Sequence, residues 1–335
     1  MAAISTGPSS DPAAGLSAGG SGFSGPNSGN GKGVGKTVYR FLSNLPTWIL
    51  WGLVALWLTP TVSLFANSFR TRDAQRASAW WLMFQDQSLT LENYQQVLTS
   101  EVAGGMWQGL LNSFAIALPA TIVPIAMAAF AAYAFAWIDF KGREWLFIGT
   151  VSLLAVPLQT SLIPLLQLYS GGAHQTIPFI DKTVTILPDM SLAGSVTAVW
   201  LTHTGFALPL AILLLHNYIV GLPQDLFESA RIDGADHFQV FLRLVLPLSV
   251  PVLAAFAIFQ FLWTWNDYLI ALTMIGGNRA ALPATVVIAS LAGEFGIQEH
   301  LLSAGAFVQI FVPIIVFFAL QRYFVRGMLA GSVKG

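Results

Sequence analysis

Long uncharged stretches alternate with short polar segments along this chain. Aspartate, glutamate, lysine and arginine are absent from six windows, at residues 41–69, 102–138, 145–180, 190–224, 244–266 and 301–321. Each window can hold the roughly 20 apolar residues that a membrane-spanning helix needs. The pattern predicts six spans, at about residues 47–69, 108–138, 145–169, 194–219, 249–273 and 303–325. Six prolines inside these spans are expected to bend their helices: Pro119, Pro124, Pro157, Pro164, Pro209 and Pro313.

Composition agrees with lipid as the main solvent. Only 9% of the residues are charged, against roughly 25% in an ordinary soluble domain. A large soluble protein with buried helices is the alternative, but six uninterrupted windows argue against it. The predicted fold class is an all-α polytopic membrane protein with six transmembrane helices, and its six-span domain covers residues 41–335. A net charge of −1 gives no electrostatic reason to expect a nucleic-acid partner.

The segment before the first window differs in composition. Residues 1–40 are rich in Gly, Ser, Ala and Pro, with too little apolar surface to offset the entropy of ordering. We expect a disordered tail there. Its segment GNGKGVGKT resembles a phosphate loop, but Asn30 stands where that loop requires its first glycine. We therefore expect neither an ATP site nor a bound cofactor on this chain.

Basic residues near the span ends predict the orientation, because inner loops are enriched in Lys and Arg. With both termini inside, ten basic residues fall on inner segments and five on outer ones. This excess predicts a cytoplasmic N-terminus and C-terminus. The outer cluster of Arg70, Arg72 and Arg76 runs against the trend. Between the first two spans, LTLENYQQVL (89–98) is expected to form a short helix at the outer surface, and residues 170–192 an outer loop.

A charged insert at residues 221–247 separates the fourth and fifth spans. Its core, DLFESARIDGADHFQVFLRLVLP, holds four acids and two bases. Pro223 suits a helix start, and Gly234 permits a sharp reversal. The pattern predicts two short amphipathic helices on either side of that glycine. They could rest on the membrane surface, although such helices usually carry Lys and Arg on the polar face. Docking of a protein partner is the other interpretation.

The spacing within this insert resembles that of ATP-binding-cassette importer permeases. Their cytoplasmic loop reads Glu-Ala-Ala, three residues, Gly, nine residues, Ile, one residue, Leu-Pro. Here the matching positions are Glu228-Ser229-Ala230, Gly234, Leu244 and Leu246-Pro247. Ser229 and Leu244 are the departures. The segments GLLNSF, WNDYL and LQRYFVRGMLAGSVKG are similar to maltose-type permeases of carbohydrate importers, so the resemblance covers about residues 40–335.

The resemblance implies a role for each part of the chain. The fold would be that of a type I importer permease, in the prokaryotic inner membrane and in contact with lipid. The expected partners are a second permease, two ATPase subunits that bind ATP and Mg, and an extracytoplasmic solute-binding protein. The insert would be the coupling helix that transmits ATPase motion. Its coupling residues would be Glu228, Ser229, Ala230, Asp233, Gly234, Leu246 and Pro247.

The solute would be a sugar or a sugar-like compound: an α-glucoside, a maltodextrin, trehalose or a glucosylated compatible solute. Sugar sites combine hydrogen-bonding side chains with aromatic rings. The polar candidates are Asn112, Gln159, His203, Asn266 and Asp267, with the rings of Trp263, Trp265 and Tyr268 nearby. Asp267 is a candidate because ionisable groups at membrane depth are often functional. It could instead be hydrated at a span end or hold a neighbouring helix, and His203 could be a packing residue.

Other functional classes fit the sequence less well. An ion-driven secondary transporter usually carries several acids or histidines at mid-membrane, and only Asp267 and His203 are available at that depth. An intramembrane enzyme would need a catalytic set. The chain has no cysteine, and the spans hold neither paired acids nor a His-Glu-x-x-His motif. The secondary transporter remains the alternative to an ATP-driven importer.

Overall fold

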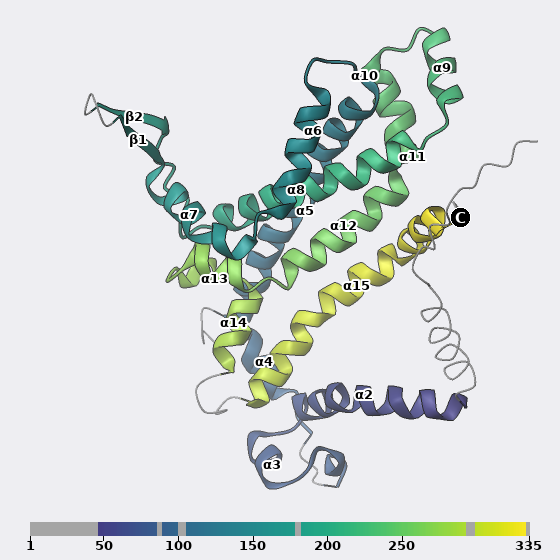
Figure 1. Cartoon of the computed structure of the whole chain (residues 1–335). Coiled ribbons are helices and arrows are strands. Elements are labelled where there is room, and N and C mark those ends of the chain that lie inside the picture. Colours follow the sequence, from purple (N-terminus) through teal and green to yellow (C-terminus); the bar gives the residue numbers. More distant parts are fainter. Residues whose placement is uncertain (1–45, 86–88, 100–104, 178–181, 293–298, 333–335) are drawn as a thin grey trace, which may run out of the picture. The chain divides into compact units, whose positions relative to one another are not determined.

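The computed structural model describes residues 46–85, 89–99, 105–177, 182–292 and 299–332. Contacts divide the chain into two units, with the boundary between Thr59 and Pro60. The described part is largely helical, with one small β-hairpin (Figure 1). The predicted tail at residues 1–40 lies outside the described residues, and the domain boundary at residue 40 stays a prediction.

The elements follow one another in this order: α2 Thr47–Ser68, α3 Arg72–Ala77, η1 Trp80–Leu82, α4 Glu92–Thr99, α5 Met106–Trp137, α6 Arg143–Ser152, η3 Leu153–Ala155, α7 Leu158–Gly171, β1 Ala173–Ile177, β2 Lys182–Leu187, α8 Val196–Val220, α9 Gln224–Ile232, α10 His237–Val240, η4 Phe241–Val245, α11 Leu246–Leu248, α12 Val250–Trp265, α13 Leu269–Ile275, η5 Arg279–Ala281, α14 Ala284–Leu291 and α15 Glu299–Ser332.

Four of these helices are long and apolar enough to cross a membrane by themselves. They are α2, α5, α8 and residues 299–321 of α15. Two bent helix pairs could each add one span, which gives four to six in the described residues. The all-α membrane fold is therefore confirmed. The count of six remains a prediction.

The third predicted span, at residues 145–169, is not one straight helix. It consists of Arg143–Ala155 and Leu158–Gly171, which meet at an angle of 104°. Proline lacks a backbone donor and pushes the residue before it into an extended conformation. Val156, directly before Pro157, is extended accordingly, with φ −76° and ψ 115°. The other five prolines expected to bend a span lie inside uninterrupted helices.

The fifth predicted span also differs in its boundaries. Helix α12 ends at Trp265, whereas the sequence pattern extended the span to residue 273. Asn266, Asp267 and Tyr268 interrupt the helix before α13 begins. At its other end, α12 meets the second insert helix at an angle of 69°. The interruption places Asp267 at a helix end and not on the side of a continuous span.

The segment expected to be an outer loop contains an antiparallel hairpin. Strand β1 pairs with β2 from Ile177 opposite Lys182 to Ala173 opposite Leu187. Both strands are rich in β-branched residues, which favour extended structure. Glycines and prolines at both ends of this segment made it look like an irregular loop.

Helix α5 packs along α8 at the centre of the larger unit. The contact is built from small side chains: Ala128, Ala129 and Ala132 of α5 and Ala207 and Ala211 of α8 are all buried. Small residues let helix backbones approach closely where the hydrophobic effect does not drive association. The alanine-rich stretch at 126–136 therefore positions these helices, as the sequence pattern predicted.

The helix expected within LTLENYQQVL is present as α4. The amide of Asn93 donates hydrogen bonds to the carbonyls of Ser68 and Arg70 at 2.9 and 2.8 Å. Arg70 itself is buried, and its guanidinium donates to the carbonyls of Ala74 and Ser78. Arg70 therefore connects local backbone segments and is not an exposed surface charge, although it counted as one in the charge comparison.

Candidate functional site

The first helix of the insert, α9, runs from Gln224 to Ile232 after Pro223. Gly234 follows with a φ of +77°, in the left-handed region where glycine has no steric penalty. The amide of Gly234 donates to the carbonyl of Arg231 at 3.0 Å, and that of Ala235 donates to Ala230 at 3.0 Å. These bonds end the helix and turn the chain sharply. The predicted reversal at Gly234 is confirmed.

The second insert helix begins with a capping box at Asp236. Its carboxylate accepts from the amide of Gln239 at 2.7 Å, while the Gln239 side chain accepts from the amide of Asp236 at 3.3 Å. The helix continues through α10 into a π-helical turn, η4, and then α11. π-helical turns inside helices are often found at functional sites.

Most candidate coupling residues lie on the exposed side of α9 or directly after it. Glu228, Ser229, Asp233 and Gly234 are exposed, and Ala230 is half-buried. Ser229 Oγ donates to the carbonyl of Asp225 at 2.8 Å, one turn earlier. Glu228 has no hydrogen-bond or ion-pair partner among the described residues.

The two remaining candidates, Leu246 and Pro247, come from α11. Leu246 packs on the core beside α8, whereas Pro247 is exposed. Large apolar side chains are also exposed on the insert: Ile232 is 86% exposed and Phe238 is 62% exposed. Exposed apolar side chains beside unpaired acids are typical of a surface that a partner covers.

Three aromatic residues of α5 hold the insert, and the sequence analysis missed this role. Trp137 stacks on Phe227 with ring centroids 3.7 Å apart and an interplanar angle of 18°. Tyr133 Oη and His237 Nδ1 share a hydrogen bond of 3.0 Å. Phe130 stacks on Phe241 at 4.5 Å. The sequence signal that could have indicated this role is the spacing of the three rings, at i, i+3 and i+7 in a helix otherwise rich in alanine.

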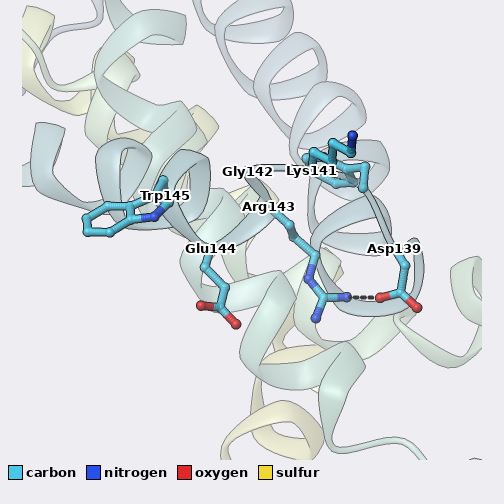
Figure 2. A pocket seen from close by; sticks show the side chains of 7 residues that line it. Asp139, Lys141, Gly142, Arg143, Glu144 and Trp145 are labelled. Carbon is cyan, nitrogen blue, oxygen red and sulfur yellow. Dashed lines mark hydrogen bonds and ion pairs between the residues drawn. The ribbon is translucent and has the colours of Figure 1, made fainter.

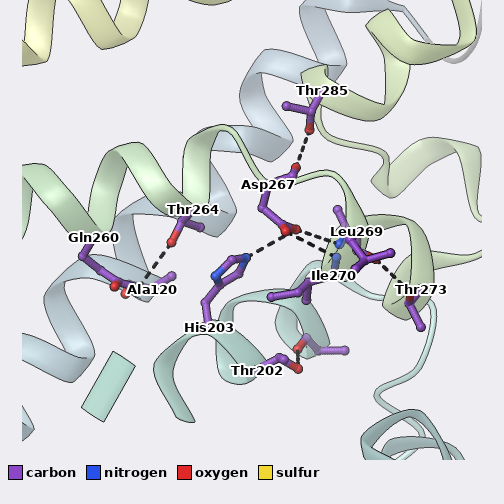
Figure 3. A network of polar contacts seen from close by, with 12 residues as sticks. Ala120, Thr202, His203, Gln260, Thr264, Asp267, Leu269, Ile270, Thr273 and Thr285 are labelled. Carbon is purple, nitrogen blue, oxygen red and sulfur yellow. Dashed lines mark hydrogen bonds and ion pairs between the residues drawn. The ribbon is translucent and has the colours of Figure 1, made fainter. Parts of the chain in front are cut away.

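Two candidate pathway residues, His203 and Asp267, lie side by side (Figure 3). His203 is fully buried in α8, and its Nε2 lies 3.5 Å from Oδ2 of Asp267. That distance is long for a hydrogen bond, and neither ring nitrogen of His203 has a hydrogen-bond partner. The Asp267 carboxylate accepts from the amides of Ile270 and Ala271 at 3.4 and 3.0 Å, so it caps α13.

Asp267 also contacts α14. Its backbone carbonyl accepts a hydrogen bond of 2.8 Å from Thr285 Oγ1. Asp267 therefore connects α8, α13 and α14 (Figure 3). Of the two interpretations in the sequence analysis, holding a neighbouring helix describes its observed contacts.

The other three polar candidates are separated. The Asn112 amide donates to the carbonyls of Ala280 and Leu282 at 2.8 and 2.9 Å, so it supports the loop before α14. Gln159 is exposed, near the break before α7. Asn266 is exposed, and its amide donates to the carbonyl of Leu262 in its own helix at 2.8 Å.

A depression of about 590 Å³ lies beside the helix break at residues 266–268. Asn266, Asp267 and Tyr268 line it together with Trp263 and three apolar residues. Trp265 is not part of it. Its ring is 2% exposed, and its indole N–H donates to the carbonyl of Gln309 in α15 at 3.3 Å. The depression thus combines polar groups with aromatic rings, and Trp265 is a packing residue.

A second depression, of about 470 Å³, lies at the turn between α5 and α6 (Figure 2). Gly142 there has a φ of +85°, which permits the tight turn. Arg143 pairs with Asp139 at 2.9 Å. Trp145 is 79% exposed and extends away from that ion pair (Figure 2). Among the described residues there is no group of His, Cys, Asp or Glu that could hold a metal ion.

The fold is that of a helical membrane protein with an exposed, charged insert between two apolar helices. A family model described as "binding-protein-dependent transport system inner membrane component" matches residues 162–330. The osmoprotective compounds uptake permease protein GgtD of Synechocystis sp. is 47% identical over 300 residues, which cover 88% of this chain and 94% of that relative. The chain therefore belongs to this family of transport permeases, and the family inferred from the insert is confirmed.

Two further comparisons agree. The alpha-glucoside transport system permease protein AglG of Rhizobium meliloti is 52% identical over 247 residues, which cover 73% of this chain and 60% of that relative. A solved structure of a bacterial ABC transporter involved in the import of the acidic polysaccharide alginate matches with a TM-score of 0.64 and 17% identity. It covers 85% of this chain and 97% of the matched chain. The fold is that of an ABC importer permease, and the chain is a transport subunit.

Proposed function

We propose that this chain is one of two membrane-spanning subunits of an ATP-driven importer for a sugar or sugar-like solute. The observation that carries the proposal is the insert: it has the permease spacing from Glu228 to Pro247, and its first helix is exposed along most of its surface. The names of the relatives support the solute class, since one transports alpha-glucosides and another osmoprotective compounds. An α-glucoside, a maltodextrin, trehalose or a glucosylated compatible solute fits this class.

Energy would come from two partner ATPase subunits, which bind ATP and Mg. Helix α9 is the coupling helix and inserts into a cleft of one ATPase. Ile232 supplies apolar area there, and fully burying such a side chain is worth about 1.5–3 kcal/mol. Glu228 accepts hydrogen bonds from basic or polar groups of the ATPase, because none of the described residues of this chain pairs with its carboxylate. Ala230 and Gly234 allow the two backbones to approach closely.

Closure of the ATPase pair on ATP displaces α9 as a rigid body, and the spans tilt with it. In this arrangement the insert and both termini are cytoplasmic. An extracytoplasmic binding protein delivers the solute at the opposite side, and a second permease completes the pathway. The depression beside Asn266 and Asp267 opens toward that pathway, where Trp263 and Tyr268 offer faces for a sugar ring.

Affinity purification tests this assembly. The tagged chain, extracted in mild detergent, should co-purify with an ATP-hydrolysing subunit and a second permease. A thermal-shift screen of the associated binding protein against α-glucosides, maltodextrins, trehalose and glucosylated polyols then identifies the solute. Recovery of the chain alone, at native expression level and in several detergents, would contradict the proposal.

A further inference from the structure

The last two turns of α5 carry an aromatic stripe, which we define as Phe130, Tyr133 and Trp137. The spacing of three and four residues places the three side chains on one face of the helix. Each ring contacts an aromatic residue of the insert: Phe241, His237 and Phe227 respectively. The stripe therefore meets both insert helices, α9 through Trp137 and the second helix through Tyr133 and Phe130.

The contact between Trp137 and Phe227 is the tertiary contact that holds α9 against α5. Phe227 is 3% exposed and is the only buried residue of that described helix. The two rings stack nearly parallel, with their centroids 3.7 Å apart. Such aromatic pairs stabilise a contact by more than their buried area alone would.

The surroundings of this stack are not tightly filled. A depression of about 140 Å³ lies between α5 and the insert, lined by Tyr133, Trp137, Phe227, Arg231, Asp236 and their neighbours. Arg231 and Asp236 are exposed, so this space is open to the surface. Because open space lies beside the stack, the rings carry a large share of the contact between α9 and α5.

The backbone of the insert continues into α8 at one end and into α12 at the other, and it has no direct covalent connection to α5. A hydrogen bond of 2.8 Å from Tyr218 Oη to the carbonyl of Leu248 joins these two connections. Displacement of α9 can thus reach α8 and α12 along the backbone. It can reach α5 through side-chain contacts, either directly at the aromatic stripe or by way of the packing of α8 on α5.

Helix α5 extends from the insert to the opposite end of the unit. Its 32 residues span about 48 Å at about 1.5 Å per residue. At that end Asn112 supports the carbonyls of Ala280 and Leu282, and Ser113 Oγ accepts from the amide of Ala284 at 2.9 Å. Gly109 permits this close approach, since a Cβ there would lie 3.2 Å from the backbone of Ala284. The loop before α14 is therefore fixed to α5.

We propose that α5 moves as a rigid helix and transmits the displacement of the coupling helix α9. Trp137 is the positioning residue that couples α5 to α9. This inference rests on the proposed function of α9. ATPase motion displaces α9 and the Trp137–Phe227 stack carries α5 along. The fixed contacts at the far end then move the loop at residues 279–284 and α14, which holds Asp267 through Thr285. Trp137 and Phe227 act as one unit throughout the transport cycle.

Substitution of the stack tests this role in the assembled transporter. Trp137→Leu and Phe227→Leu should each lower ATP-driven solute uptake at least tenfold while the ATPase still co-purifies in normal amount. The double variant should be no worse than either single one, since both remove the same contact. Trp145→Leu is the matched control, because its ring is largely exposed on the neighbouring turn, and it should retain uptake. Uptake within twofold of wild type in Trp137→Leu overturns the inference.

A crosslinking experiment separates positioning from simple folding. The natural chain has no cysteine, so Trp137→Cys with Phe227→Cys introduces the only two thiols. Before crosslinking, this variant should have lost most uptake. Joining the thiols with a short bifunctional reagent should restore at least half of it, because α9 and α5 then move together again. A crosslinked protein that remains inactive shows that the two helices must separate or that the stack is only structural, and it overturns the proposal.

The two experiments also distinguish failure of this inference from failure of the proposed function. If the wild-type complex shows no ATP-dependent uptake, the importer assignment itself fails. Suppose instead that the wild type transports with ATP, that Glu228→Lys abolishes uptake and that Trp137→Leu transports normally. The coupling role of α9 then stands, and only the proposed transmission through α5 fails.

Discussion

The imidazole of His203 and the carboxylate of Asp267 lie 3.5 Å apart across the contact between α8 and the start of α13. His203 is fully buried, and the Asp267 side chain is only 12% exposed. The carboxylate also accepts from two backbone amides of α13. Asp267 therefore caps α13 and also faces the buried His203, next to the depression proposed for the solute.

Two substitutions at Asp267 separate these roles. Asp267→Ala removes the cap, and loss of a cap costs about 0.5–2 kcal/mol, so the purified complex should melt at a lower temperature. Asp267→Asn keeps one acceptor oxygen for the cap but loses the charge that faces His203. It should keep most of the stability and still lose solute uptake. Equal uptake and equal solute affinity in Asp267→Asn and wild type would remove this side chain from the pathway.

Gly234 should tolerate alanine better than proline. The left-handed φ of +77° costs an L-residue about 1–2 kcal/mol, although no atom lies within 4 Å of a Cβ placed there. Proline cannot adopt that φ, and it removes the amide that bonds to Arg231. We expect Gly234→Ala to reduce uptake moderately and Gly234→Pro to reduce it at least tenfold, both at normal membrane levels. Gly149→Ala, at an open position inside α6, is the control. Near-normal uptake with Gly234→Pro would count against the coupling role.

Glu228→Lys should release the ATPase. The side chain is exposed and without a partner in the described chain, so reversing its charge should leave this subunit intact and act only at the docked surface. We expect much less ATPase in pull-downs from membranes, and uptake near background. Asp225→Lys, three residues earlier on the same helix, tests whether any charge reversal has this effect. Equal losses in both variants would point to general electrostatics and against a specific contact.

Asn112→Ala should affect stability and not solute selectivity. Its amide supports two carbonyls before α14, and losing a typical intramolecular hydrogen bond costs about 0.5–1.5 kcal/mol. The melting temperature should fall, while the relative uptake of different sugars should stay the same. The control is Gln159→Ala, which should not change stability because Gln159 is exposed. A changed sugar preference in Asn112→Ala would return this residue to the solute pathway.

The sequence predicted the features that follow from local chemistry. Lipid tolerates few charges, so the uncharged windows located the long helices α2, α5, α8 and α15 within a few residues. The two short helices of the insert and the reversal at Gly234 were also predictable, because they depend on residues close to each other in the chain.

Features that depend on contacts between distant segments could not be predicted. Asn112 looked like a pathway residue, because its partners lie about 170 residues further along the chain. Trp265 looked like a sugar platform until its burial against α15 was known. The aromatic stripe of α5 was hidden for the same reason, since Trp137 acquires its role only when Phe227 is placed against it.

Solute uptake by the purified complex in proteoliposomes tests the central claim most directly. The vesicles contain this chain, the second permease and the ATPase subunits, with the solute-loaded binding protein outside and ATP with Mg enclosed. The account predicts that labelled solute accumulates only when ATP is hydrolysed, and that Glu228→Lys in this chain abolishes accumulation. Uptake by this chain alone, driven by a proton or sodium gradient without ATP, would contradict it.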